Sequence, residues 1–267
     1  MSTPRRGFAE LVAVLHRLRS PGGCPWDAEQ THETLRPYLL EEAYEVLEAI
    51  DEGDDAEFRD ELGDLLLQVV FHSELAAERQ AFTIDDVTEA ICSKLIRRHP
   101  HVFADVTVED SAEVERNWSA IKTQERKDKG NAEASAIDGV PRALPGLTRA
   151  HRLGEKASAV GFDWSNPIDV RAKVAEELAE ADAAAAAGES EAFTEEIGDL
   201  LFAVTSWARL SGVHAEFALE GALAKFSDRF RSLEASLRAQ GREPAACSSD
   251  ELEAAWQVAK KQVAAAS

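Results

Sequence analysis

Residues 41–64 read EEAYEVLEAIDEGDDAEFRDELGD, and residues 176–199 read EELAEADAAAAAGESEAFTEEIGD, 135 positions further along the chain (176 − 41 = 135). In both stretches, acidic residues three or four positions apart flank a central glycine, Gly53 or Gly188. Residues at this spacing share one face of a helix, and a glycine followed by polar residues ends one helix and caps the next. Each stretch therefore predicts two antiparallel helices whose short connection brings their carboxylates together.

Helical periodicity extends over most of the chain outside these two stretches. Apolar residues recur every three or four positions, as at Phe8, Leu11, Val12, Leu15 and Leu18. Together with the two hairpins, the pattern predicts an all-α protein. Beyond this first helix, the predicted helices, including those of the hairpins, cover 33–51, 55–79, 84–98, 110–126, 144–159, 167–186, 190–211, 214–240 and 249–264.

The two halves of the chain repeat each other. Besides the acidic stretches, His-Arg-Leu at 16–18 recurs at 151–153, again 135 positions on. Further along the register shifts, so that Lys94 and Arg98 match Lys225 and Arg229, and Trp118 and Lys122 match Trp256 and Lys260. Glycine and proline gather between Arg126 and Pro145, as in a linker. We predict a duplicated helical module: an amino-terminal module at 1–128, a linker at 129–143 and a carboxy-terminal module at 144–267.

The composition limits the kind of ligand. The 267 residues include 50 acidic and 29 basic ones, a net charge of −21, which argues against binding a nucleic-acid polymer. A small phosphorylated ligand stays compatible if a metal ion lies between it and the protein. Three widely spaced cysteines, Cys24, Cys92 and Cys247, fit a reducing compartment. With no apolar run of membrane-spanning length, we expect a cytoplasmic protein that does not contact a membrane.

Two acidic quartets are the candidate metal sites. Oxygen ligands suit Mg²⁺, or Mn²⁺, and four crowded carboxylates repel one another unless a cation lies among them. A single quartet would be better explained as a solvated acidic face of a helix. Here the quartet occurs twice with the same spacing, each time followed by an apolar run, and this repetition favours metal binding. The helix after the first quartet continues into Val69, Val70 and Phe71, which we expect to be buried. The quartets are Glu42, Glu45, Glu61 and Asp64 in the first module, and Glu177, Glu180, Glu196 and Asp199 in the second.

Basic and aromatic residues follow each quartet. Lys225 and Arg229 share one helical face, as do Trp256 and Lys260. Alone they would fit an exposed face and a core tryptophan, but their recurrence after each quartet predicts a phosphate-binding set beside the metal.

The quartet pattern resembles the signature of the MazG nucleoside triphosphate pyrophosphohydrolases, in the all-α NTP pyrophosphatase superfamily. The supporting strings are CPWD at 24–27, LRPY at 35–38, RRHPHVF at 97–103, GFDW at 161–164 and Lys225-Phe226 with Arg229-Phe230. The resemblance covers nearly the whole chain and implies two tandem helical-bundle modules. It further implies Mg²⁺-dependent hydrolysis of NTPs and dNTPs between the α- and β-phosphates, yielding a nucleoside monophosphate and pyrophosphate. The enzyme would be a homodimer that cleans the nucleotide pool, with paired modules from two chains building the sites.

The resemblance also implies residue roles. The carboxy-terminal module is expected to be catalytic and the amino-terminal one mainly structural, although its quartet is intact. Glu177, Glu180, Glu196 and Asp199 would hold Mg²⁺, and Glu176 would orient or deprotonate the attacking water. Lys225, Arg229 and Lys260 would bind the triphosphate, with Trp256 packing near the nucleotide. Whether any protein group acts as general base, how many metal ions bind, and which nucleotide is preferred stay open at this point.

Two alternatives compete with this interpretation. A di-iron four-helix bundle needs two Glu-x-x-His pairs, and only Glu29 with His32 fits. A catalytically degenerate acidic scaffold that binds a protein partner would share the composition and the repeats.

Overall fold

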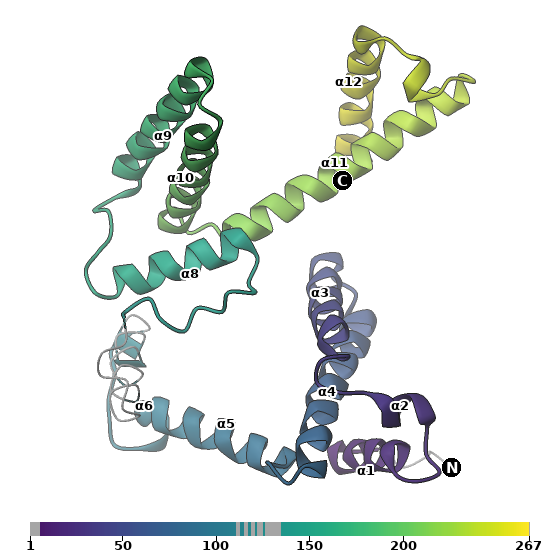
Figure 1. Ribbon diagram of the computed structural model, residues 1–267, viewed down its shortest axis with the longest axis vertical. Helices are drawn as coiled ribbons and strands as arrows, with labels where there is room; N and C mark the ends of the chain where they lie inside the picture. The colour runs from purple at the N-terminus through teal and green to yellow at the C-terminus, as the bar shows by residue number, and fades with distance from the viewer. Residues whose placement is uncertain are drawn as a thin grey trace. The chain divides into compact units, whose positions relative to one another are not determined.

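The computed structural model describes residues 6–110, 113, 114, 117, 118, 121, 125 and 135–266. In this part of the chain every regular element is a helix, which confirms the all-α prediction (Figure 1). The chain separates into two compact units, unit 1 at Met1–Arg126 and unit 2 at Lys127–Ser267. Residues 129–134 of the predicted linker lie outside the described residues.

Unit 1 is built on a helical hairpin. Its helices are α1 (Phe8–Arg19), α2 (Pro25–Glu29), α3 (Arg36–Glu52), α4 (Asp55–Glu78), α5 (Ile84–Arg98) and α6 (Pro100–Phe103). As predicted, α3 ends at Gly53, whose φ of 72° is in the left-handed region, and the Asp54 carboxylate caps α4 by accepting from the amides of Ala56 and Glu57. Within the predicted 110–126 helix, the described residues after Asp110 are helical.

The start of α3 differs from the prediction of residue 33. Thr31 and Thr34 exchange hydrogen bonds between backbone amides and side-chain hydroxyls, at 2.8 and 3.2 Å. This local turn competes with helix geometry, so that α3 begins only at Arg36. The short helices α2 and α6 were not predicted, because four or five residues are too few to show a period.

The core of unit 1 lies between α1, the start of α3 and the second half of α4. Buried there are Leu15, Leu35, Val70, Phe71 and Leu75. The expectation for Val70 and Phe71 is confirmed, whereas Val69 is 40% exposed, because it projects from another face of α4.

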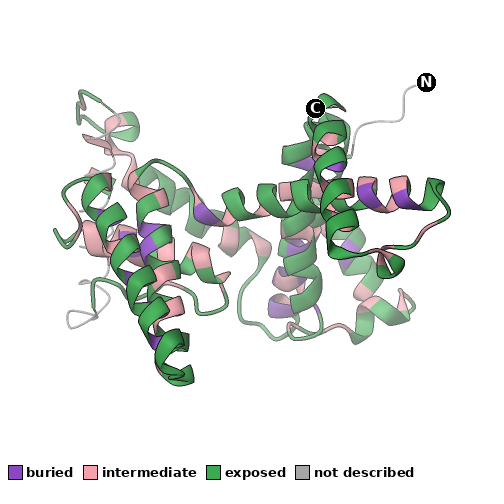
Figure 2. Ribbon diagram, turned by 90° about the horizontal axis from the view of Figure 1, so that it is seen from above, coloured by how far each residue is buried: buried purple, intermediate pink, exposed green. Residues whose placement is uncertain are grey.

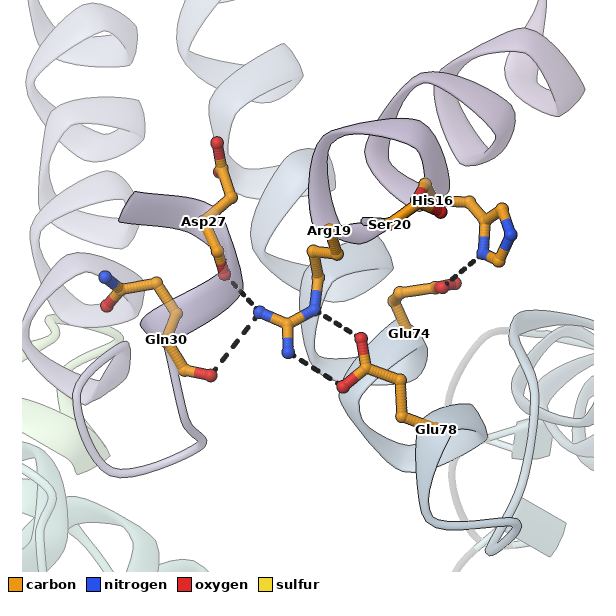
Figure 3. Close-up of polar contacts among 7 residues, drawn as sticks. All are labelled: His16, Arg19, Ser20, Asp27, Gln30, Glu74 and Glu78. Atoms are coloured by element: carbon orange, nitrogen blue, oxygen red, sulfur yellow. Dashed lines mark hydrogen bonds and ion pairs between the residues drawn. The ribbon is translucent and has the colours of Figure 1, made fainter. Parts of the chain in front are cut away.

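At one edge of this core, the Arg19 side chain forms hydrogen bonds with two neighbouring helices (Figure 3). Its guanidinium donates two hydrogen bonds to the Glu78 carboxylate, at 2.6 and 2.8 Å, and others to the backbone oxygens of Asp27 and Gln30. It also lies over the Phe71 ring, 5.4 Å from the centroid. One side chain thus ties the end of α1 to α2 and to the end of α4.

Unit 2 repeats the hairpin with longer flanking helices. Its elements are α8 (Gly146–Ser158), α9 (Pro167–Ala187), α10 (Ser190–Leu210), α11 (Ala215–Ala239), the 3₁₀ turn η1 (Pro244–Ala246) and α12 (Ser249–Ala266). Helices α9 and α10 lie side by side, joined at Gly188, whose φ is 73°. Leu233, Leu237 and Ala259 form a separate small core where α12 packs on α11. Buried residues occur as short purple stretches on helices that are otherwise mostly exposed (Figure 2).

Candidate metal and phosphate site

In unit 1 the helical hairpin brings three carboxylates together. Glu42 comes from α3, and Glu61 and Asp64 come from the first turns of α4. One oxygen of each lies within 4.8 Å of the others, a separation that a single cation can bridge. Helix geometry explains the grouping, because Glu61 and Asp64 are three residues apart on the side of α4 that faces α3.

Unit 2 places the corresponding residues in the same way. Glu177 on α9 and Glu196 and Asp199 on α10 also offer oxygens within 4.8 Å of one another. Glu177 is only 5% exposed, which makes it the most buried carboxylate of the two groups. Two acidic groups at equivalent places in a duplicated module indicate a shared binding property.

The predicted fourth members, Glu45 and Glu180, are not in these close groups. They are nevertheless electrostatic neighbours: the charge of Glu45 helps to raise the pKa of Glu61, and that of Glu180 helps to raise the pKa of Glu196. Glu176 lies on the exposed side of α9, beside the group rather than within it.

The electrostatics of both groups favour a cation. Burial is the main cause that raises the pKa of Glu42, followed by the charges of Asp64 and Glu45. Burial also leads for Glu61 and Glu196, whose pKa values are raised further by neighbouring carboxylates. Carboxylates that resist ionisation in one another's presence are stabilised by a bound cation, and oxygen ligands suit Mg²⁺ or Mn²⁺. The residues present therefore fit a hard divalent ion.

The acidic groups of the two units differ in two neighbouring residues, Lys173 and Gln68, that the sequence analysis did not identify. In unit 2 the Lys173 ammonium contacts the carboxylates of Glu177 at 2.7 Å and Glu176 at 2.8 Å. In unit 1 the position 135 residues earlier is Tyr38. There the buried Gln68, whose counterpart in unit 2 is Ala203, acts to lower the pKa of Glu42. The signal for Lys173 was its spacing, four residues before Glu177 on the same helix.

The predicted phosphate-binding residues of unit 2 lie on α11 and α12. Lys225 is exposed, and Arg229 is half-buried with an Nε that has no hydrogen-bond partner among the described residues. Trp256 is half-buried against the small α11–α12 core and 5.3 Å from the Phe226 ring, and Lys260 lies one turn further along α12. Within unit 2, α12 packs along α11 away from the α9–α10 hairpin (Figure 1). The structure thus assembles an acidic group and a cationic group in different places on one unit.

Unit 1 carries the counterpart set at the end of α5. Arg98 lies over the Trp118 ring, 5.7 Å from the centroid, and pairs with Glu125. Lys122, the counterpart of Lys260, lies outside the described residues.

The histidines do not form the di-iron motif. The Nδ1 of His32 lies 2.8 Å from the Nδ1 of His72, and the two rings are stacked. In the part of the chain that the structure describes, the groups that could hold a metal contain carboxylates alone. The Glu29–His32 alternative therefore finds no support.

Comparisons with known proteins agree with this geometry. The MazG nucleotide pyrophosphohydrolase domain matches residues 30–103 and 166–233, one match in each unit. The "Nucleoside triphosphate pyrophosphohydrolase" of Escherichia coli K12 is 47% identical over 94% of this chain and 96% of its own length. The "Nucleoside triphosphate pyrophosphohydrolase/pyrophosphatase MazG" of Thermotoga maritima is 46% identical over 95% of each chain. No helix among the described residues is both long enough and apolar enough to cross a membrane.

Proposed function

Since this chain belongs to the MazG nucleotide pyrophosphohydrolase family, we propose that it hydrolyses NTPs and dNTPs between the α- and β-phosphates, releasing a nucleoside monophosphate and pyrophosphate. The observation that carries the proposal is the convergence of Glu177, Glu196 and Asp199 on one point of unit 2. The reaction would serve to clean the nucleotide pool of the cytoplasm.

We assign the acidic residues of unit 2 to two roles, metal binding and orientation of the attacking water. Glu177, Glu180, Glu196 and Asp199 would hold Mg²⁺, which neutralises charge on phosphate oxygens when bound. Glu176 would orient the attacking water or accept its proton; its carboxylate contacts Lys173, which also contacts Glu177.

The remaining triphosphate charge would be neutralised by Lys225, Arg229 and Lys260. Trp256, packed against Phe226, would border the nucleotide. Because these residues lie apart from the acidic group within unit 2, we propose that two chains form a homodimer in which facing units complete each site.

Exposed apolar side chains support the homodimer. Leu178 on α9 and Leu201 on α10 are 50% and 51% exposed, although they belong to the site-bearing hairpin, and Phe226 on α11 is 54% exposed. Burial of such exposed apolar side chains against a second chain would stabilise the homodimer. In this arrangement unit 2 would be catalytic and unit 1 mainly structural.

The test is product analysis after incubating the full chain with ATP, and separately with dNTPs, in the presence of Mg²⁺. We expect AMP and pyrophosphate from ATP, with activity reduced at least a hundredfold in Glu180→Gln. The matched change in unit 1, Glu45→Gln, is the control and should leave most of the activity. ADP with phosphate would contradict the reaction, and no turnover of any nucleotide by the wild type would favour the acidic scaffold.

A further inference from the structure

The arginines at the end of α5 share one internal carboxylate. Arg98 Nη2 lies 2.5 Å from Oε2 of Glu125, and its Nε lies 3.2 Å from the same oxygen. Arg97 Nε donates to the other oxygen, Oε1, at 2.7 Å. The Arg98 and Glu125 side chains are only 14% and 17% exposed. Both carboxylate oxygens are thus used, in a place partly shielded from water.

The same place in unit 2 has no such carboxylate. Arg98 corresponds to Arg229, and Trp118 to Trp256. Glu125 follows Trp118 by seven residues, and the residue seven after Trp256 is Val263, which carries no charge. The Nε of Arg229 is buried and has no hydrogen-bond partner among the described residues. The two units therefore keep the arginine and the tryptophan but differ in the anion.

A carboxylate and a phosphate present the same pattern to arginine, with two oxygens that accept parallel N–H donors. The Arg98 guanidinium lowers the pKa of Glu125 to about 2, assisted by Arg97, so the anion is fully charged at neutral pH. A ligand phosphate would have to displace a partner that is already ionised, shielded and attached to the same unit.

We propose that the Arg97–Arg98–Trp118 set is a second phosphate-binding site, in which the Glu125 carboxylate takes the place of a ligand phosphate group. Unit 1 then holds an intact acidic group but binds no triphosphate, because its cationic half is already neutralised. Loss of Glu125 opens the site to a nucleotide phosphate. The inference rests on the proposed function, since it takes Arg229 to bind phosphate in unit 2.

The experiment measures binding stoichiometry by calorimetry on the full chain. The probe is α,β-methylene-ATP with Mg²⁺, which cannot be cleaved between the α- and β-phosphates. We expect one equivalent per wild-type chain and two per chain for Glu125→Val, with the added equivalent lost again when Arg98→Ala is combined with it. The reciprocal change, Val263→Glu, should weaken binding at unit 2 at least tenfold.

Two further variants keep the result interpretable. Glu125→Gln removes the negative charge but keeps the size and shape of the side chain. It replaces Glu125→Val in the binding measurement if Glu125→Val does not fold. Glu113→Gln removes one negative charge from the same segment, where its carboxylate accepts from the Glu109 amide, and should stay at one equivalent. If folded Glu125→Val or Glu125→Gln binds only one equivalent of the nucleotide, the inference is overturned but the proposed function is not. No binding by the wild type overturns the proposed function, and the inference with it.

Discussion

The ammonium of Lys173 lies 2.7 Å from Oε1 of Glu177, so the most buried carboxylate of the candidate metal groups already has a cation at its side. Tyr38 stands in the equivalent position of unit 1 and cannot supply that charge. The two acidic groups are therefore not electrostatically equivalent, although their carboxylates are placed alike.

Replacing Lys173 by Met should strengthen metal binding at unit 2 by about fivefold. The lysine and the metal ion compete for Glu177 and repel each other, and a partly exposed ion pair contributes up to about 1 kcal/mol. Calorimetry with Mn²⁺ measures the change, and the reciprocal Tyr38→Lys should weaken binding at unit 1. Arg171→Gln, which removes an exposed charge from the same helix, is the control. Weaker binding by Lys173→Met would show instead that the lysine positions Glu177 for the metal.

Magnesium should stabilise unit 2 against heat, and chelation should reverse the effect. One site at a metal concentration a hundred times its Kd adds about 2.7 kcal/mol, which corresponds to a melting shift of about 9 °C for a unit of this size. Scanning calorimetry with and without EDTA checks this. The shift should disappear in Glu177→Gln/Asp199→Asn and persist in Asp182→Asn/Glu191→Gln, which removes equal charge from the same two helices. A shift of equal size in both double variants would mean non-specific screening.

Unit 1 should lose stability as the pH falls from 7.5 to 5.5. The hydrogen bond between the two Nδ1 atoms of His32 and His72 needs one of them unprotonated, and burial, then the charge of His32, lowers the pKa of His72 from 6.5. Because its folded-state pKa is depressed, His72 binds fewer protons in the folded state than in the unfolded state as the pH falls through 6.5, so its contribution to stability is lost on acidification. Urea midpoints at both pH values measure the loss.

The variant His72→Phe tests the cause of this pH dependence. It should be less stable at pH 7.5, because His32 loses its partner, but its midpoint should change less with pH. His101→Gln, at a helix end, should keep the wild-type pH dependence. An unchanged slope in His72→Phe would contradict the assignment.

Arg19→Met should destabilise unit 1 by about 3 kcal/mol, because Glu78 and two backbone oxygens lose a shared donor. Arg19→Lys should recover little of the loss, since an ammonium cannot form the paired contacts of a guanidinium. Urea unfolding measures both variants. Arg59→Met, at a pair exposed on both sides, should change stability by less than 0.5 kcal/mol or so. Full recovery by lysine would mean that charge alone matters at this position.

Local sequence signals predicted much of the fold. The α9–α10 hairpin follows from the helical period and from Gly188, both of which act within a few residues. Glu42, Glu61 and Asp64 could be grouped in advance because one short turn joins their helices. In contrast, the pairing of Arg98 with Glu125 depends on tertiary packing over 27 residues, which no period encodes. The placement of Lys225 and Trp256 relative to the acidic group within unit 2 likewise depends on tertiary packing.

The short connection at Gly188 also has a consequence for the order of synthesis. All the clustered carboxylates of unit 2 lie between Glu177 and Asp199, a contiguous piece of chain whose contacts are local. Local contacts form fastest, so this hairpin can close on the ribosome before α11 and α12 have been translated. The carboxylates that would hold Mg²⁺ under the proposed function, all within one 23-residue segment (199 − 177 + 1 = 23), can therefore be in place before Lys225, Arg229, Trp256 and Lys260 have been added to the chain.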